Sequence, residues 1–298
     1  MAYGLCCKTL NTVFKKKTWA AFSREYKTST AAIENLQRLW ADNLRTTIRL
    51  YKLCWSRGWT YRMSSSLLPL ATHPLMPYEW AKHPLAPELV AKEIKNCRAL
   101  VSSLGVRASM HPDQFNVLAS TNLQAIEKTI IELSLQGQLM SAIGLPESYE
   151  SPINLHLNNS TDSPTIVQKR FWATFGRLPE CVQKRLVLEN EDKGNWTVHN
   201  LRKYFPTIPT TFDNLHHKCN PGGSLSVKEA AEICALSWPT KPLFHYSESM
   251  KGDKNPRKHG DVPFGKPPKL SCDVDWEVEL KTKDVAIEIL EGVKPTVD

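Results

Sequence analysis

The sequence predicts an α/β fold, a (β/α)8 TIM barrel formed by a single domain over residues 1–298. Two observations carry this prediction. Short apolar segments typical of buried strands alternate eight times with longer segments of helical periodicity, as in consecutive βα units of a parallel sheet. The length of 298 residues suits one closed barrel better than an open doubly wound sheet, and we find no internal repeat or low-complexity linker.

The first element is expected to be a strand at residues 3–8, followed by a polar loop over residues 9–30. This loop carries Lys15, Lys16 and Lys17, a charge run that either faces solvent or contacts phosphate groups.

A long helix is expected at residues 31–57, and Gly58 would end it. Apolar residues recur along this segment at helical spacing. They are Leu36, Leu39, Trp40, Leu44, Ile48, Tyr51 and Leu53.

The remaining strands are short apolar runs that lead into polar residues. They are expected at residues 60–64, 105–111, 153–156, 186–188, 207–212, 242–244 and 274–279. The segments between them have helical periodicity or helix-boundary signals. These helices are expected at residues 86–104, 122–143, 163–175, 179–185, 197–204, 227–235 and 283–290. A loop rich in Lys, Arg and Gly spans residues 251–267.

Composition limits the class of protein. The eight cysteines form no C-x-x-C pair, as expected for buried thiols in a reducing compartment. The N-terminus lacks a basic segment followed by a long apolar run, and no apolar stretch approaches the ~20 residues of a membrane span. We therefore expect a soluble, cytoplasmic protein with no signal peptide and no membrane partner. The formal charge of +8 favours a polyanionic partner through counterion release.

Histidines and carboxylates collect where the predicted strands end. Active sites of such barrels lie at the C-terminal face of the sheet, so these side chains should meet there. At strand ends are His111, His156, Glu189, Asp213, His216, His245 and Glu279, and in loops of the same face are His73 and His259. One such histidine alone is more often a core or surface residue, but their joint placement favours a site.

The stretch 107–115 illustrates the pattern. Pro112 cannot continue a sheet ladder, so the chain must leave the sheet directly after His111. His111 is then held on a rigid strand end, while Gln114 and Phe115 follow on the loop. A possible metal ligand and a possible reader of substrate thus lie a few residues apart.

Histidine and carboxylate without cysteine suit Zn²⁺, Mn²⁺ or Fe. The predicted set exceeds the needs of one ion, so we expect two or three divalent ions. Ions ~3.5–4 Å apart are used for phosphodiester cleavage. Together with the basic charge, this points to a nucleic-acid backbone as the substrate.

Seven short motifs follow one another across nearly the whole chain. They are segment 61–74 with His73-Pro74, Ser109-Met-His111-Pro-Asp-Gln114-Phe115, Leu188-Glu189-Asn-Glu-Asp192, Asp213-x-x-His216, His245-Tyr-Ser, His259-Gly-Asp261 and Glu279-x-Lys281. Single motifs are loose. In order and spacing, the set resembles the ultraviolet (UV) DNA damage endonucleases, which are relatives of the endonuclease IV TIM barrels.

The resemblance implies a trinuclear metal site, usually described with manganese, with Zn²⁺ or Mg²⁺ as alternatives. It implies an enzyme that nicks double-stranded DNA immediately 5′ to cyclobutane pyrimidine dimers and 6-4 photoproducts, acting as a monomer in a prokaryotic or phage setting. By position the metal ligands are His73, His111, His156, Glu189, Asp213, His216, His245, His259 and Glu279. The catalytic residues among them would be Glu189, His216 and Glu279.

Gln114 and Phe115 match the wedge of this family, which enters the gap left when the lesion flips out. A flat ring can stack on the orphaned bases and an amide can bond to their edges. Tyr3 is the third residue expected to read the lesion.

Two positions depart from the family pattern. Family members often carry a lysine, modified to a carboxylate, two residues before the histidine of the seventh strand. Here Leu243 holds that position, and Lys241 lies four residues before His245. Either a ligand is replaced or the third ion is held differently. Near the first strand the family has Tyr and Asn. The residues in this chain are Leu5 and Thr9, with Tyr3 and Asn11 close by.

Two other functions remain open from the sequence. A metal-dependent sugar isomerase or epimerase of the same barrel type would need a closed polar pocket, and it gives no reason for the charge of +8. A non-catalytic damaged-DNA-binding protein would not need a complete set of ligands.

Overall fold

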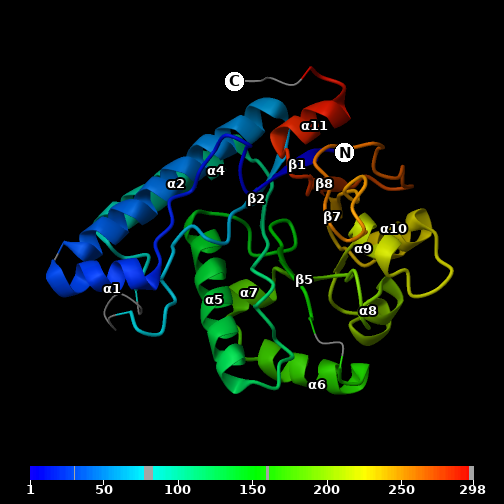
Figure 1. Ribbon diagram of the computed structural model, residues 1–298, viewed down its shortest axis with the longest axis horizontal. Coiled ribbons are helices and arrows are strands. Elements are labelled where there is room, and N and C mark those ends of the chain that lie inside the picture. Colours follow the sequence, from blue (N-terminus) through cyan, green and yellow to red (C-terminus); the bar gives the residue numbers. More distant parts are fainter. Residues whose placement is uncertain (30, 77–82, 159–160, 295–298) are drawn as a thin grey trace.

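The computed structural model describes residues 1–29, 31–76, 83–158 and 161–294, and its centre is a sheet of eight parallel strands (Figure 1). The strands are β1 (Tyr3–Cys6), β2 (Thr60–Met63), β3 (Ala108–Met110), β4 (Ile153–Leu155), β5 (Leu186–Glu189), β6 (Thr210–Thr211), β7 (Leu243–Tyr246) and β8 (Asp275–Val278). Their order in the sheet is β6-β5-β4-β3-β2-β1-β8-β7, with β1 paired to β8. The strands thus run almost once around an axis, and the predicted (β/α)8 barrel is confirmed.

The barrel closes between β6 and β7 through one short contact. Asp213 and His245 form an isolated parallel bridge, and the amide of His245 donates to the carbonyl of Phe212 over 2.9 Å. Asp213 and His245 are both predicted metal ligands. The seam that completes the barrel therefore also joins two of the polar strand ends.

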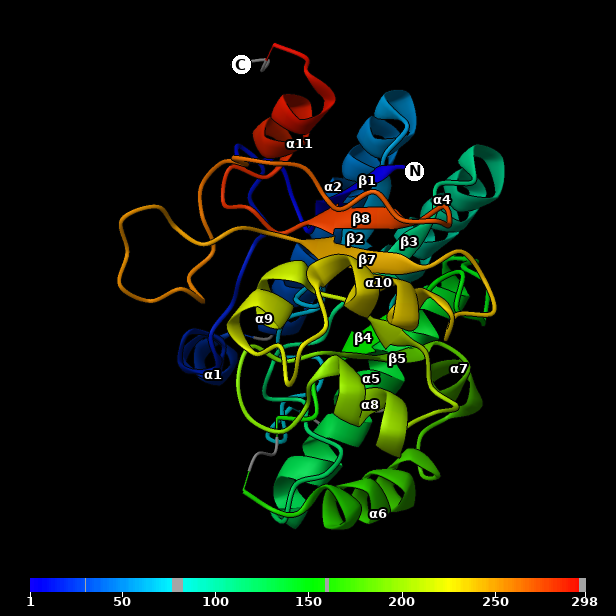
Figure 2. The same cartoon turned by 90° about the vertical axis from the view of Figure 1, so that its right-hand side faces the viewer.

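Helices surround the strands (Figure 2). They are α1 (Trp19–Thr28), α2 (Ala32–Arg57), α4 (Glu88–Leu104), α5 (Leu123–Ala142), α6 (Pro164–Phe175), α7 (Glu180–Gln183), α8 (Val198–Tyr204), α9 (Asn214–Cys219), α10 (Val227–Ala235) and α11 (Asp284–Glu291). Figure 2 shows α1 and the long segment between β7 and β8 projecting from the same side of the barrel. Within the described ranges, no helix combines the length and the apolar character needed to cross a membrane.

Helix α1 corrects the expectation of a loop over residues 9–30. The side chain of Thr18 caps it by accepting a hydrogen bond from the amide of Ala21. Phe22 is fully buried and stacks on Tyr26 at 5.6 Å between ring centroids. Phe22 is the single buried residue of α1, so this helix lacks the long apolar stripe by which sequence reveals amphipathic helices.

The region after β5 also differs from expectation. The strand expected at residues 207–212 is reduced to Thr210–Thr211, and α9 follows it at once. Asp213 starts α9, because its Oδ1 accepts from the amide of His216 over 2.7 Å. This cap fixes the position of His216 relative to the strand end.

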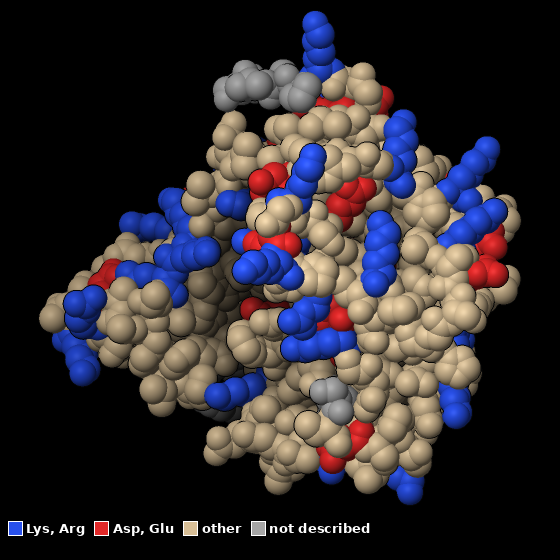
Figure 3. All heavy atoms as spheres, turned by 45° about the vertical axis from the view of Figure 1, so that its right-hand side comes forward, with Lys and Arg blue, Asp and Glu red and all other residues tan. Residues whose placement is uncertain are grey.

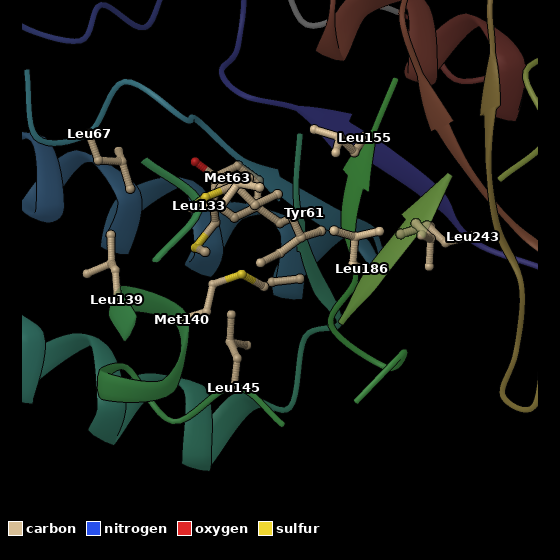
Figure 4. Packing of buried hydrophobic residues seen from close by; sticks show 14 of the residues in the cluster. Tyr61, Met63, Leu67, Leu133, Leu139, Met140, Leu145, Leu155, Leu186 and Leu243 are labelled. Atoms are coloured by element: carbon tan, nitrogen blue, oxygen red, sulfur yellow. The ribbon is translucent and has the colours of Figure 1, made fainter. Parts of the chain in front are cut away.

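An apolar layer lies between the strands and the helices. Figure 4 shows Tyr61 and Met63 of β2 close to Leu133 and Met140 of α5, and all four are at most 1% exposed. Burying each such side chain contributes about 1.5–3 kcal/mol. Because side chains alternate along a strand, this packing leaves the opposite face of β2 to the barrel interior, where Arg62 lies.

We predict that the barrel interior does not accept a side chain at position 4. A Cβ on Gly4 would lie 2.4 Å from Thr60 Oγ1 and 3.0 Å from Glu277 Cγ. Gly4→Ala should therefore lower the free energy of unfolding by about 1–3 kcal/mol, measured by chemical denaturation. Gly176→Ala is the matched control, since its Cβ meets only the Trp172 carbonyl oxygen at 3.6 Å and its φ is −62°. Equal stability of the two variants would contradict the prediction.

Candidate metal centre

Glu189 is the centre of the cluster at the strand ends. It ends β5, is 1% exposed, and has nitrogen atoms of four histidines around its carboxylate. His111 Nε2 and His245 Nδ1 each lie 3.1 Å from Oε2. His156 Nε2 lies 3.6 Å from Oε2, and His216 Nδ1 lies 3.1 Å from Oε1. His111 and His156 follow β3 and β4, His216 lies in α9 after β6, and His245 lies in β7, so the barrel brings together residues far apart in the sequence.

Three groups of side chains bring possible ligand atoms within 4.8 Å of one another. They are His111–His156–Glu189, His111–His245–Glu279 and Glu189–Asp213–His216. His111 and Glu189 each belong to two groups. Groups that share members are suited to hold ions close together, as in multinuclear phosphodiesterases.

Several of these atoms are buried without a hydrogen-bond partner. Among the described residues they include Glu189 Oε1, Asp213 Oδ2 and His245 Nδ1. Each buried polar atom left in this state costs about 1–3 kcal/mol. Two ligands on one Zn²⁺ at ~2.0–2.1 Å from it lie roughly 3–4 Å apart. The spacings of 3.1–3.6 Å around Glu189 match this value, so the residues fit a divalent metal.

Neighbouring acceptors orient two of the rings. His111 Nδ1 lies 3.0 Å from the carbonyl oxygen of Pro112, and His245 Nε2 lies 3.3 Å from Glu277 Oε2. Carbonyl and carboxylate oxygens accept, so both contacts are hydrogen bonds in the tautomer that carries its hydrogen on these nitrogens. In that tautomer the other nitrogen of each ring faces Glu189 and can present its lone pair to a cation.

Asn190 ties the ends of β5 and β6 together. Its side chain donates to the carbonyl of Asp213 over 3.0 Å and accepts from the amide of Asp213 over 2.8 Å. Its own carbonyl lies 2.9 Å from His216 Nδ1. Asn190 was not among the predicted site residues, yet it sets the position of two of them.

Burial and local charge determine which rings are neutral. Burial lowers the pKa of His156 to about 4, which keeps this ring in the neutral, metal-binding form. Burial and Arg62 act to lower the pKa of His245, but Glu189 and Glu279 outweigh them and raise it to about 10. A cation bound at His245 would therefore have to displace a proton.

A buried ion-pair network, not predicted from the sequence, lies beside the cluster. Arg62 Nε donates to Glu277 Oε2 over 2.5 Å, and Arg62 Nη1 donates to Glu279. Ser109 also donates to Glu277. Burial acts to raise the pKa of Glu277, but Arg62 and His245 lower it to about 2. Glu277 is thus a fixed negative charge that holds the far nitrogen of His245.

The structure gathers eight of the nine predicted ligands and leaves one apart. His259 Nδ1 lies 3.8 Å from Glu279 Oε2, at the edge of the cluster. His73 stacks on Trp19 instead, with ring centroids 4.3 Å apart and an interplanar angle of 8°. Its Nδ1 accepts from the amide of Leu75 over 3.3 Å.

Gln114 and Phe115 lie on the loop that follows β3, here called the recognition loop (residues 113–117). Both are exposed, and Phe115 is 77% exposed. The loop borders a cavity of about 790 Å³ that His73 and Lys128 also line. A large aromatic ring presented to solvent beside a cavity is suited to stacking on a ligand.

Residues near the first strand do not reach this cavity. Tyr3 begins β1, is 7% exposed and packs in the apolar core. Leu5 is fully buried in the same core. Thr9 bonds to the hydroxyl of Thr12 over 2.5 Å, and Asn11 is exposed. The structure therefore brings Gln114 and Phe115, but not Tyr3, to the cavity.

The position expected for a modified lysine holds Leu243 in this chain, and β7 contains no lysine that could take its place. Leu243 is buried on the same face of β7 as His245, two residues away. Lys241 lies before the start of β7, away from the cluster, and its Nζ is 2.6 Å from Asp275 Oδ1. The buried cation beside the carboxylates is Arg62, not Lys241.

Basic side chains surround a hollow in the molecular surface. Figure 3 shows this hollow flanked by Lys and Arg, with Asp and Glu inside it. Two segments that project from one side of the barrel are rich in basic residues (Figure 2). These residues are Lys15, Lys16, Lys17, Arg24 and Lys27, and Lys251, Lys254, Arg257, Lys258, Lys266 and Lys269.

Comparison with known proteins bears out the resemblance. A family model described as UV-endonuclease UvdE matches residues 2–295. The UV-damage endonuclease of Neurospora crassa is 31% identical over 273 residues, which are 85% of this chain and 40% of that protein. The UV DNA damage endonuclease of Bacillus pumilus is 29% identical over 288 residues, covering 92% of this chain and 86% of the relative. The chain thus spans less than half of the fungal relative and most of the bacterial one.

Solved structures agree on the fold. The structure of SacUVDE superposes with a TM-score of 0.80 at 24% identity and covers 98% of both chains. Endonuclease IV from Thermus thermophilus gives a TM-score of 0.58 at 13% identity, again over 98% of both chains. The predicted relationship to the endonuclease IV barrels is therefore confirmed at the level of fold.

We predict that Glu189→Gln lowers Mn²⁺ affinity about 100-fold or more, because His156, His216 and Asp213 occur only in metal groups that contain this carboxylate. Glu277→Gln should cost about tenfold, since it loosens His245 without removing a ligand. Calorimetric titration and metal analysis measure both effects. Glu127→Gln, on the exposed face of α5, is the matched control. Unchanged metal content in Glu189→Gln would contradict the assignment.

Proposed function

Because the chain belongs to the UV-endonuclease UvdE family, we propose that it is a DNA repair endonuclease that nicks the backbone immediately 5′ to UV photolesions. The observation that supports this most is the convergence of four histidines on buried Glu189, next to Asp213 and Glu279. Cyclobutane pyrimidine dimers and 6-4 photoproducts would be the lesions. The products would carry 3′-hydroxyl and 5′-phosphate ends, from which excision repair can begin.

The proposed catalytic residues are Glu189, His216 and Glu279. When bound, two or three divalent ions supply Lewis-acid chemistry, polarising phosphoryl oxygens, promoting ionisation of water and offsetting charge on the leaving oxygen. Glu189 would help to hold more than one ion, because it belongs to two of the candidate ligand groups. Glu279 is fixed by Arg62, and His216 by the carbonyl of Asn190. With these groups oriented, the protein needs no nucleophilic side chain.

The proposed ligand set contains the eight gathered residues and His73. His73 would have to leave its stack on Trp19 to join the others. Mn²⁺ is the proposed cofactor, and Zn²⁺ and Mg²⁺ are the alternatives to compare in the same assay. Histidine-rich sites accept Mn²⁺ and Zn²⁺ more readily than Mg²⁺, which prefers oxygen ligands.

Gln114 and Phe115 are the proposed readers of damage. A photolesion is badly stacked, so extruding it costs less free energy than extruding a normal pair. The exposed ring of Phe115 can then stack on the unpaired bases, and the amide of Gln114 can bond to their edges. Discrimination would rest on this difference in the cost of opening the duplex.

Double-stranded DNA is the proposed partner, held through its phosphates by Lys and Arg side chains such as those that flank the hollow in Figure 3. Such contacts position the duplex without reading its sequence and weaken as salt concentration rises. We further propose that residues 1–298 act as one domain and as a monomer, associated with cytoplasmic DNA.

Cleavage of one defined photoproduct tests the proposal. A duplex oligonucleotide with a single cyclobutane dimer should be nicked at the phosphodiester 5′ to the lesion in the presence of Mn²⁺ and left intact with chelator. Glu189→Gln should lower the rate by at least about 100-fold, because the shared ligand is lost. Glu127→Gln should cleave like the wild type. Full cleavage by Glu189→Gln, or a cut at a random position, would refute the proposal.

The reading role predicts a different defect. Gln114→Ala combined with Phe115→Ala should reduce the preference for damaged over intact duplex by about tenfold or more, since stacking on one base alone is worth about 1–3 kcal/mol. Metal content should stay that of the wild type. Loss of metal together with loss of lesion preference would contradict the prediction, by showing that Gln114 or Phe115 supports the metal centre.

A further inference from the structure

Asn158 lies at the junction of the metal centre and the recognition loop. It follows the predicted ligand His156 by two residues, just beyond β4. Its φ of +52° is in the left-handed region, which Asn adopts more readily than other residues with a side chain. The chain thus turns sharply after His156, and this turn directs the Asn158 side chain at the recognition loop.

Two hydrogen bonds of 2.7 Å meet at Asn158. Its backbone amide donates to Glu191 Oε1, and its side-chain amide nitrogen donates to the carbonyl oxygen of Gln114. A carbonyl oxygen only accepts, so the nitrogen of the Asn158 side chain must face Gln114. Glu191 itself is 7% exposed, and its carboxylate is therefore a fixed anchor rather than a mobile surface group.

The other bonds of the recognition loop do not fix Gln114. The amides of Phe115 and Asn116 bond to Asp113 over 3.0 and 2.9 Å, which only shapes the turn from within. The amide of Val117 bonds to Thr129 Oγ1 over 3.0 Å and attaches the end of the loop to α5. The bond from Asn158 attaches the middle of the loop, at the carbonyl of one of the two proposed reading residues.

We propose that Asn158 is a positioning residue that sets the recognition loop at a fixed place relative to the metal centre. Its anchor, Glu191, is two residues from the central ligand Glu189. One path of bonds therefore leads from the segment just beyond the β5 end that carries Glu189, through Glu191 and Asn158, to Gln114. This inference rests on the reading role given to Gln114 and Phe115 under the proposed function.

Two variants separate the side-chain bond from the turn. Asn158→Gly keeps the left-handed backbone and the amide that bonds to Glu191, and removes only the bond to Gln114. Asn158→Asp keeps the shape but places an acceptor against the Gln114 carbonyl. The control is Asn220→Gly, because the Asn220 amide bonds to the carbonyls of Glu191 and Gly194 and does not contact the recognition loop.

Hydrogen exchange of the full chain without DNA is the first measurement. Amides of residues 113–117 should exchange about threefold to tenfold faster in Asn158→Gly and Asn158→Asp, the loss expected for one hydrogen bond. Asn220→Gly should leave them unchanged. Unchanged exchange in both Asn158 variants would overturn the proposal.

Nicking with Mn²⁺ is the second measurement. Both Asn158 variants should raise KM for a duplex with one cyclobutane dimer about threefold to tenfold, with kcat within about twofold of the wild type and metal content unchanged. A fall in kcat with loss of metal would instead overturn it, by showing that Asn158 supports His156. If the wild type nicks no damaged duplex, the proposed function fails, and the exchange measurement alone decides the role of Asn158.

Discussion

The buried carboxylate of Glu189 imposes the main physical requirement on this barrel, because its negative charge must be compensated away from water. An ionised carboxylate removed from water is unfavourable by several kcal/mol unless donors or cations surround it. Here the amide of Asn154 donates to it, and four histidine rings from four different βα units lie around it, where a cation held between the rings and the carboxylate would offset its charge. Because these groups come from around the barrel, the arrangement exists only when the barrel is closed. The closing seam is the bridge between Asp213 and His245, which belong to the same cluster.

Arg62 explains how so many carboxylates can lie together. Glu277 and Glu279 share its guanidinium, which offsets their mutual repulsion and that of nearby Glu189. The compensation is incomplete, since Arg62 pairs with neither Glu189 nor Asp213. Their buried oxygens without partners are the ones left to a cation. Arg62 thus neutralises Glu277 and orients Glu279, while the unpartnered oxygens of Glu189 and Asp213 stay available to a cation.

The sequence predicted the polar residues at the strand ends better than the polar residues inside the strands. The ends of parallel strands meet at one rim, so polar residues after apolar runs identified seven of the eight gathered predicted ligands without any knowledge of register. Ser109 and Glu277 were missed because a polar residue inside a short strand seldom indicates a site. A signal was available, since each lies two residues before a predicted ligand and so shares its face. The stack of His73 on Trp19 depends on the path of α1, which carries no long apolar stripe and could not be predicted.

A nuclease that cuts at a fixed offset from a lesion must hold its reading and cutting groups at a fixed separation. Loops alone rarely do this, because they move more than the strands they join. The recognition loop is tied at its start to the strand end of His111 through the rigid Pro112, and at its middle to Asn158. Two attachments on different strands restrain both displacement and rotation, which one attachment would not. The barrel itself would then fix the distance between the metal centre and the proposed reading residues Gln114 and Phe115, without any movement of the metal ligands.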